Sequence, residues 1–338
     1  MLKLSYVLVA ALLLSACVPT PAVQPTQPPL RTVRFMAGYK PQANLPFVAV
    51  YVAQANGYFA QQGLQAEITH ASGQGEHLKL LLQGTLDVTT ASGDEVLARR
   101  ADDVPVVAFA VLGQRDQRAY AVLESSPIRT LKDWEGRTIG FKVEPAPDYL
   151  AMLAAAGVDR ARIQEVPVGF DPRLLAAGKV DVYPVFESNE PDTLQRIGAA
   201  VRLFRPGEFG VPGLGLTFET RQALLESDPD LLARFLKATL HAVEWTRDHR
   251  EEATDIIMQW APQEDRAHQR AMLDVELDMA DSAVTRERGL GWASREQWQA
   301  FHDSLLRFGG VSKPVAVETA FSDAILQRIY ADNRLQWP

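Results

Sequence analysis

The stretch LLQGTLDVTTASGDE, Leu81–Glu95, decides the fold, because its plan returns as LLAAGKVDVYPVFESNE at Leu174–Glu190. In each copy a leucine-rich helical turn ends at a glycine, and an Asp-Val pair then opens a short apolar strand. Gly84 aligns with Gly178, 94 positions later. Any two α/β units could share such a join. The repeat nevertheless predicts two related units whose strands end in different residues.

The sequence around the repeat alternates short apolar runs with helical ones. From Thr32 the order is β-α-β-α-β, which predicts a mostly parallel sheet with right-handed crossovers, and a second unit of this kind begins at Thr130. From Ser227 onward the pattern is almost wholly helical. Because ligands of open parallel sheets bind beyond the carboxyl ends of the strands, the residues after each Asp-Val strand are site candidates.

Composition and the N-terminus suggest an exported, lipid-anchored protein. The 338 residues are 47% hydrophobic and carry a net charge of −8, which gives no basis for a nucleic-acid partner. Lys3 and an apolar run precede Leu14-Ser15-Ala16-Cys17, the pattern of a bacterial lipobox, in which Cys17 takes the lipid. Cys17 is the only cysteine, and a lone cysteine there could also be incidental. The following segment, Val18–Arg31, contains five prolines and predicts an extended tether.

Several of these segments together resemble solute-binding proteins of ABC importers, in the family related to thiamine-pyrimidine synthase. They are YVAQANGYFAQQGLQAEI (Tyr51–Ile68), TLKDWEGRTIGF (Thr130–Phe141) and the two copies of the repeat. The resemblance implies an α/β type II periplasmic-binding-protein fold, in which two lobes close on a small-molecule ligand like a hinge. It also implies a membrane permease as partner and a location on the extracytoplasmic face of the cell membrane.

The resemblance, with the N-terminal pattern, divides the chain into five parts. We expect a signal peptide at 1–16, a lipidated proline-rich tether at 17–31, lobe 1 at 32–122 and lobe 2 at 123–215. The last part, 216–338, is expected to return to lobe 1 and to end in a helical tail packed on it.

Two functions of other classes are weighed against a carrier. The enzyme that makes the thiamine pyrimidine relies on a cysteine-rich iron-binding segment, but this chain has no cysteine after Cys17. Its six histidines form no metal-binding pattern, so we predict neither an enzyme nor a bound metal or cofactor. A ligand-sensing lipoprotein without transport has the same sequence features and stays open.

The candidate site residues come from both lobes. In lobe 1 they follow the ends of strands, where rings can stack on a planar ligand and small residues expose backbone N–H groups. They are Tyr39, Asn44, Phe47, Ser72, Gly73, Ser92 and Gly93. In lobe 2 they are Lys142, Tyr149, Phe186, Glu187 and Asn189. Phe47 could instead belong to the core, and the segment around Phe186 could be an ordinary surface loop.

This set of residues favours a flat, uncharged heteroaromatic ligand. A carboxylate at Glu187 suits N–H donors such as those of an isoalloxazine or an aminopyrimidine, and it disfavours an alkylsulfonate. We predict riboflavin, with a thiamine pyrimidine precursor as the alternative. The segment Leu112–Tyr120 offers space and donors for a ribityl chain.

Overall fold

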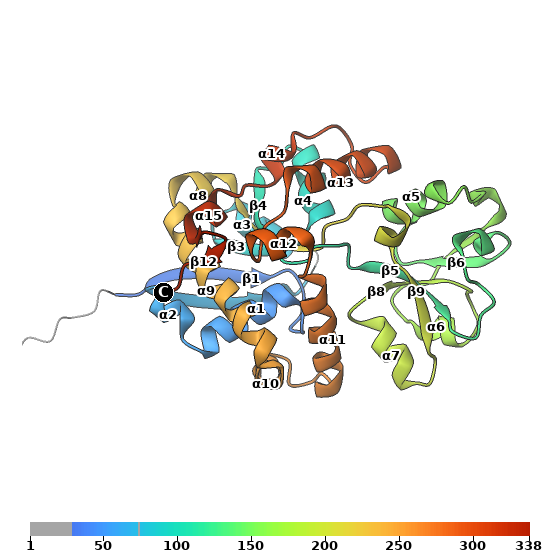
Figure 1. Ribbon diagram of the computed structural model, residues 1–338, viewed down its shortest axis with the longest axis horizontal. Helices are drawn as coiled ribbons and strands as arrows, with labels where there is room; N and C mark the ends of the chain where they lie inside the picture. Colours follow the sequence, from blue (N-terminus) through green and yellow to red (C-terminus); the bar gives the residue numbers. More distant parts are fainter. Residues whose placement is uncertain (1–28, 74) are drawn as a thin grey trace, which may run out of the picture.

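Two lobes lie side by side in the computed structural model, which describes residues 29–73 and 75–338 (Figure 1). Cys17 and most of the predicted tether lie outside the described residues. None of the described helices combines the length and the apolarity that crossing a bilayer requires. Two segments connect the lobes, one after β4 and one before β10 (Figure 1).

Lobe 1 is built on a five-stranded sheet with the order β2-β1-β3-β10-β4. Its strands are β1 (Arg31–Ala37), β2 (Leu64–His70), β3 (Val88–Ser92), β4 (Val106–Val111) and β10 (Leu216–Arg221). β1 pairs in parallel with β2 and β3, whereas β10 runs antiparallel to both of its neighbours. The predicted parallel unit is therefore present, and the returning chain inserts one reversed strand into it.

Lobe 2 repeats this arrangement. β8 (Tyr183–Phe186), β5 (Arg118–Leu123) and β9 (Val201–Phe204) form an antiparallel sheet, and β6 (Thr138–Phe141) pairs in parallel with β7 (Gln164–Pro167). A parallel bridge between Ile139 and Val182 joins the two groups, so the order is β7-β6-β8-β5-β9. β5 occupies the place of β10 in lobe 1. Because β5 pairs within the second sheet, the chain enters lobe 2 by Arg118, before the expected boundary at Val122.

The helices cover both sheets and fill the C-terminal part of the chain. Those before β10 are α1 (Leu45–Ala55), α2 (Tyr58–Gln61), α3 (Glu76–Leu82), α4 (Gly93–Ala101), η1 (Leu131–Trp134), α5 (Pro147–Ala155), η2 (Arg160–Arg162), α6 (Arg173–Ala176), α7 (Glu190–Arg196) and η3 (Pro206–Phe209). Those after it are α8 (Gln222–Ser227), α9 (Pro229–Asp248), α10 (Arg250–Trp260), α11 (Arg266–Met279), α12 (Ala283–Arg288), α13 (Arg295–Phe308), α14 (Val317–Ala320) and α15 (Ala324–Ile329). A short hairpin, β11 (Tyr330–Ala331) with β12 (Arg334–Leu335), ends the chain. Most of the tail packs on lobe 1, where α9 lies against α1 and α14 against α4, whereas α13 contacts both α4 of lobe 1 and α5 of lobe 2.

The repeated glycine and aspartate have the same structural roles in both lobes. Gly84 and Gly178 end α3 and α6 with φ values of +76° and +64°, a backbone conformation that favours glycine. Three residues later an aspartate accepts a backbone N–H from the neighbouring parallel strand, which is β1 in lobe 1 and β6 in lobe 2. Asp87 accepts from Arg34, and Asp181 accepts from Thr138, both at 2.9 Å. The shared motif therefore fixes where β3 and β8 enter their sheets.

Each lobe has its own aromatic core. In lobe 1, Phe35 and Phe218 meet Phe235 of α9 at ring-centre distances of 6.0 and 5.2 Å. In lobe 2, Trp134 stacks on Tyr149 at 6.1 Å. Burying such a side chain stabilises the fold by about 1.5–3 kcal/mol. The lobes can therefore behave as separate bodies.

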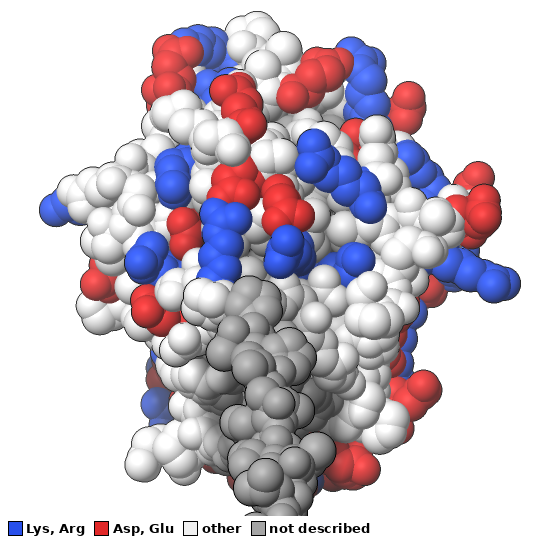
Figure 2. All heavy atoms as spheres, turned by 90° about the vertical axis from the view of Figure 1, so that its left-hand side faces the viewer, with Lys and Arg blue, Asp and Glu red and all other residues white. Residues whose placement is uncertain are grey.

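One face of lobe 1 carries interspersed lysine, arginine, aspartate and glutamate side chains (Figure 2). No single sign of charge dominates the visible part of this face.

Candidate functional site

Two cavities lie between the lobes. We call cavity A the one of about 600 Å³ that contains Tyr39, Asn44 and Phe47 in its wall. Cavity B, of about 570 Å³, contains Asp94, Arg118, Lys142 and Tyr149. Glu95, Phe170 and Phe186 belong to the walls of both. The two cavities are thus neighbouring parts of one interlobe cleft.

The ends of strands deliver the side chains of this cleft, as the parallel-sheet rule predicts. In lobe 1 the residues after β1 and β3 reach it, and in lobe 2 those after β6 and β8 do. α1 begins at the edge of cavity A, where Pro46 occupies the first turn and Asn44 is the N-cap. α4 begins at the edge of cavity B, where Ser92 and Glu95 form a capping box.

Cavity A combines aromatic rings with amide groups. Tyr39 is 57% exposed, which leaves its ring free, whereas Phe47 is only 2% exposed. The side-chain amide of Asn44 donates to Glu276 at 3.2 Å and its oxygen accepts from Gln42 at 2.5 Å. These groups can bind a planar molecule by its face and by its hydrogen-bonding edge.

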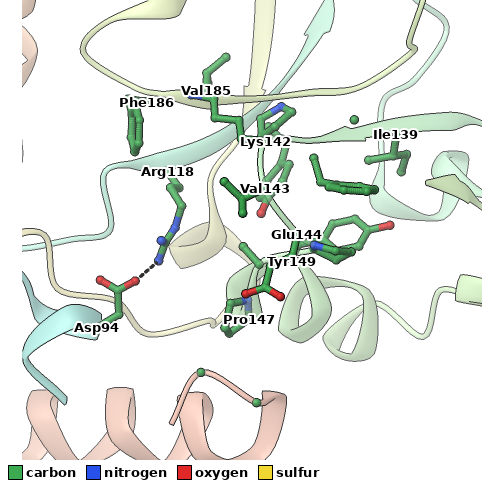
Figure 3. A pocket seen from close by; sticks show the side chains of 18 of the residues that line it. Asp94, Arg118, Ile139, Lys142, Val143, Glu144, Pro147, Tyr149, Val185 and Phe186 are labelled. Carbon is green, nitrogen blue, oxygen red and sulfur yellow. Dashed lines mark hydrogen bonds and ion pairs between the residues drawn. The ribbon is translucent and has the colours of Figure 1, made fainter. Parts of the chain in front are cut away.

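Cavity B has a charged wall and an aromatic floor (Figure 3). Asp94, from lobe 1, accepts a hydrogen bond at 3.0 Å from Arg118, which belongs to lobe 2. Lys142 forms an ion pair with Glu190, and its Nζ lies 4.1 Å from the centre of the Phe186 ring. The positive charges on this wall are therefore neutralised by neighbouring carboxylates.

Arg118 faces more carboxylates than it can neutralise. Asp94, Asp116 and Asp148 lie 3.0, 3.1 and 3.2 Å from its guanidinium nitrogens. Burial raises the pKa of Asp116 to about 7, with Arg118 opposing the rise and the other two aspartates adding to it. Burial also acts to raise the pKa of Asp94, but Arg118 and hydrogen bonds outweigh it and lower that pKa. Within this cluster, Asp116 is therefore the carboxyl group that most readily takes up a proton.

The lobes also touch at the edge of cavity A. Ser188 of lobe 2 donates to the Glu276 carboxylate of α11 at 2.9 Å. His268 of α11 lies 2.6 Å from Asp192 and 3.0 Å from Asn189, both in lobe 2. Burial raises the pKa of Glu276, while hydrogen bonds from Leu45, Ser188 and Asn44 oppose the rise. α11 is therefore a wall of the cleft as well as part of the tail.

Seven of the predicted site residues lie in the cleft. Tyr39, Asn44, Phe47 and Asn189 line cavity A, Lys142 and Tyr149 line cavity B, and Phe186 lines both. Phe47 also belongs to the core of lobe 1, as the alternative interpretation of this residue expects. Tyr149 is 3% exposed and its hydroxyl donates to Glu165 at 3.0 Å.

Four of the residues predicted in lobe 1 contribute to a turn, a helix cap or close backbone packing instead of lining the cleft. Ser72 and Gly73 belong to an exposed turn, where Ser72 donates its N–H and hydroxyl to Glu76. Ser92 caps α4. Gly93 packs so closely on the segment before β10 that an added Cβ would lie 2.9 Å from the Leu214 side chain. None of the four lines either cavity.

Glu187 does not meet the ligand cleft either. Its carboxylate is 2.8 Å from Arg205 and 3.3 Å from Arg115, next to the segments that connect the lobes. Its backbone N–H donates to Gln117 at 2.8 Å. The expected contact between this carboxylate and ligand N–H groups is therefore wrong, because the side chain turns to the hinge while Phe186 faces the cleft.

Other cleft residues were not predicted. Phe170, 66% exposed, follows β7 and obeys the same strand-end rule that indicated Phe186. His268, Gln269 and Met272 come from α11, where no sequence signal separates a cleft wall from a packed tail helix. Within the described part of the chain, no group of three or more His, Cys, Asp or Glu is arranged to hold a metal ion.

Comparison with known proteins agrees with this geometry. The chain is 28% identical to the riboflavin-binding protein RibY of Chloroflexus aurantiacus, with 92% of this chain and 94% of the relative aligned. It is 26% identical to a formylaminopyrimidine-binding protein of Halalkalibacterium halodurans, with 95% and 98% aligned. Both are named as binding proteins, in agreement with the prediction that the chain is not an enzyme.

The predicted fold is confirmed by a solved structure. The periplasmic aliphatic sulphonate binding protein SsuA from Escherichia coli superposes with a TM-score of 0.66 at 17% identity, covering 88% of this chain and 97% of that one. A family model described as NMT1/THI5 like matches residues 44–253. Because this match spans more than half of the chain, the protein belongs to the NMT1/THI5-like family.

Proposed function

We propose that this protein is the extracytoplasmic substrate-binding component of an ABC importer for a planar, uncharged heteroaromatic vitamin, with riboflavin as the first choice. The two relatives that align with most of the chain are named for riboflavin and for formylaminopyrimidine. The two-lobed fold supports capture between lobes that close, followed by delivery to a membrane permease.

The observation that carries the proposal is the pairing of every lysine and arginine that lines the cavities. Lys40 lies 2.7 Å from Glu264, Lys142 pairs with Glu190, and Arg118 pairs with Asp94. An anionic ligand such as a sulfonate needs cationic groups that are free to neutralise it. These pairs favour an uncharged ligand, although the solved structure of similar fold binds sulphonates.

Aromatic side chains support a flat ligand. Tyr39 of lobe 1 and Phe186 of lobe 2 both line cavity A, so a ring bound there can contact one lobe by each face. A volume of about 600 Å³ lies within the range of pockets that bind drug-sized ligands. An aminopyrimidine is the second candidate, supported by the named relative, and it would fill a smaller share of this space.

The test is a titration of the purified protein with riboflavin, formylaminopyrimidine and an alkylsulfonate. Stacking on Tyr39 or Phe186 should quench flavin fluorescence, and we expect saturable quenching by riboflavin and no heat of binding for the sulfonate. If only the pyrimidine showed saturable binding, the second candidate would be the ligand. Binding of neither vitamin-related compound would refute the proposal.

Membrane attachment through Cys17 is part of the same proposal. The lipobox pattern supports it, and a tether of about fifteen residues would hold the binding lobes above the lipid surface. Cys17→Ser should release the protein from the membrane fraction, or leave it unprocessed, with its ligand affinity unchanged. Continued lipid anchoring of the variant would contradict the assignment. Loss of riboflavin uptake on deleting the protein would distinguish an importer from a sensor.

A further inference from the structure

The cleft contains more space than a ring system alone requires. Cavity B is nearly as large as cavity A, and the two share the side chains of Phe186, Phe170 and Glu95. A ring bound in cavity A against Phe186 therefore has open space beyond its edge. That space leads towards the Asp94–Arg118 pair.

The wall of cavity B offers hydrogen-bond donors and acceptors close together. The side chains of Asp94 and Arg118 are 21% and 26% exposed, so both remain accessible from the cavity. Ionised carboxylates accept hydrogen bonds and a guanidinium donates them, which suits a hydroxyl group that does both. Tyr149 and Leu305 provide apolar surface beside these groups for carbon atoms. A chain that carries several hydroxyls matches this mixture.

The charge of cavity B also excludes one class of substituent. Four carboxylate side chains line it, Asp94, Glu95, Glu144 and Glu165, against the two cations Arg118 and Lys142. Both cations are already paired with carboxylates. Arg99 and Arg160 in turn pair with Glu95 and Glu165. A phosphate on the end of the ligand would therefore find no free cation among the described residues in the wall of cavity B.

We propose that the cleft binds an elongated ligand in two parts: a planar ring in cavity A, and an uncharged polyhydroxylated chain that passes Phe186 into cavity B and binds Asp94 and Arg118. This inference rests on the proposed function and specifies its substrate class. Asp94 belongs to lobe 1 and Arg118 to lobe 2, so the chain would be held by both lobes. Cavity B then selects a flavin with its ribityl chain over a bare ring and over a phosphorylated flavin.

The experiment compares three flavins. Riboflavin carries the ribityl chain, lumiflavin carries a methyl group in its place, and flavin mononucleotide adds a phosphate to the chain. We expect riboflavin to bind about tenfold or more tightly than either, because lumiflavin lacks the hydroxyls that hydrogen-bond in cavity B and flavin mononucleotide brings a phosphate to a wall whose described residues offer no free cation. Dissociation constants come from fluorescence quenching, checked by calorimetry.

Asp94→Asn tests the residue assignment. The variant should fold, because Arg118 keeps Asp116 and Asp148 as partners. It should weaken riboflavin binding several-fold and leave lumiflavin binding unchanged. The matched control is Asp102→Asn, an exposed aspartate at the other end of α4 that lines neither cavity, which should alter neither affinity.

The outcomes separate this inference from the function on which it rests. Equal binding of riboflavin and lumiflavin would refute the two-part cleft and leave a flavin carrier standing. An equal loss of both affinities in Asp94→Asn would refute the role of Asp94 in holding the chain. If flavin mononucleotide bound as tightly as riboflavin, the proposal that cavity B requires an uncharged end on the ligand chain would be wrong. Binding of none of the three flavins would refute the riboflavin proposal itself, and the inference with it.

Discussion

Replacing Asp116 by Asn should stabilise the protein at neutral and alkaline pH. One Asp116 oxygen accepts the backbone N–H of Arg118 at 2.9 Å, and the other lies 3.1 Å from a guanidinium nitrogen that Asp94 also uses. Asp148 contacts the same guanidinium. The cluster therefore holds three carboxylates for one cation, and Asp116→Asn removes the surplus negative charge while retaining one acceptor oxygen.

The sign and size follow from the pKa of Asp116. Burial, with help from the neighbouring aspartates, raises it from 3.8 to about 7 in the folded protein. A raised pKa contributes stability that is fully present below the unfolded value and is lost as the pH rises to about 7. A shift of this size corresponds to about 4 kcal/mol, as an upper limit because three carboxylates share it. Asn resembles the neutral acid, so the variant should match the wild type near pH 4 and exceed it above pH 7.

The assay is urea unfolding of both proteins at pH 4, 6 and 8, compared by the difference in the free energy of unfolding. Titrating groups outside this cluster contribute equally to both proteins, so the difference reports on Asp116 and the aspartates that share its shift. The control is Asp94→Asn, because the pKa of Asp94 is lowered and its contribution is lost as the pH falls. That variant should lose stability relative to the wild type at high pH. An Asp116→Asn protein less stable than the wild type at pH 8 would show that attraction to Arg118 outweighs burial, and would refute the reasoning.

Three further changes test the cleft, the hinge and the scaffold. Phe186→Ala should weaken riboflavin binding by about tenfold, since an aromatic contact contributes about 0.5–1.5 kcal/mol beyond the buried area, and calorimetry on a folded variant checks this. Glu187→Gln should leave the riboflavin affinity within about twofold. It should lower the unfolding midpoint, because the Glu187 carboxylate forms ion pairs with Arg115 and Arg205. A tenfold loss of affinity would instead show that Glu187 contributes to ligand binding. Asp181→Ala should cost about 1–3 kcal/mol by leaving the Thr138 N–H unpaired, whereas Asp181→Asn, which keeps an acceptor, should cost less in the same urea assay.

The duplicated motif made most of the fold predictable. A leucine-rich turn, a glycine and an Asp-Val pair encode a helix end, a left-handed turn and a strand start, and each step is local in the sequence. Gly84 and Gly178 end their helices at positive φ, and Asp87 and Asp181 accept the same kind of bond from the neighbouring strands β1 and β6. The reversed position of β10 in the sheet is not local, since it depends on where the chain returns from lobe 2.

Residues after strand ends were predicted to reach the cleft, but the direction of each side chain was not. Ser72 and Ser92 follow strands as Phe186 does, yet their hydroxyls bond to Glu76 and Glu95 at the starts of the next helices. A serine at an N-cap satisfies backbone groups that would otherwise lack partners, so capping competes with ligand binding for the same residue type. The sequence contains no signal that decides between the two.

The contribution of α11 was hidden for another reason. Its helical periodicity predicts burial against lobe 1, and Met272 and Leu273 are indeed buried. His268 and Glu276 of the same helix nevertheless contact lobe 2. Which stripe of a helix faces a second lobe depends on how the lobes are docked, and this is a property of the whole fold.

Phe186 and Glu187 show why the divergent end of the repeat carries two functions at once. Successive residues leaving a strand point to opposite sides, so one faces the cleft and the other faces the hinge. Phe186 lines both cavities, with Lys142 over its ring, while Glu187 ties β8 to Arg115 and Arg205. A change of ring at Phe186 can therefore alter ligand preference without loosening the connection between the lobes.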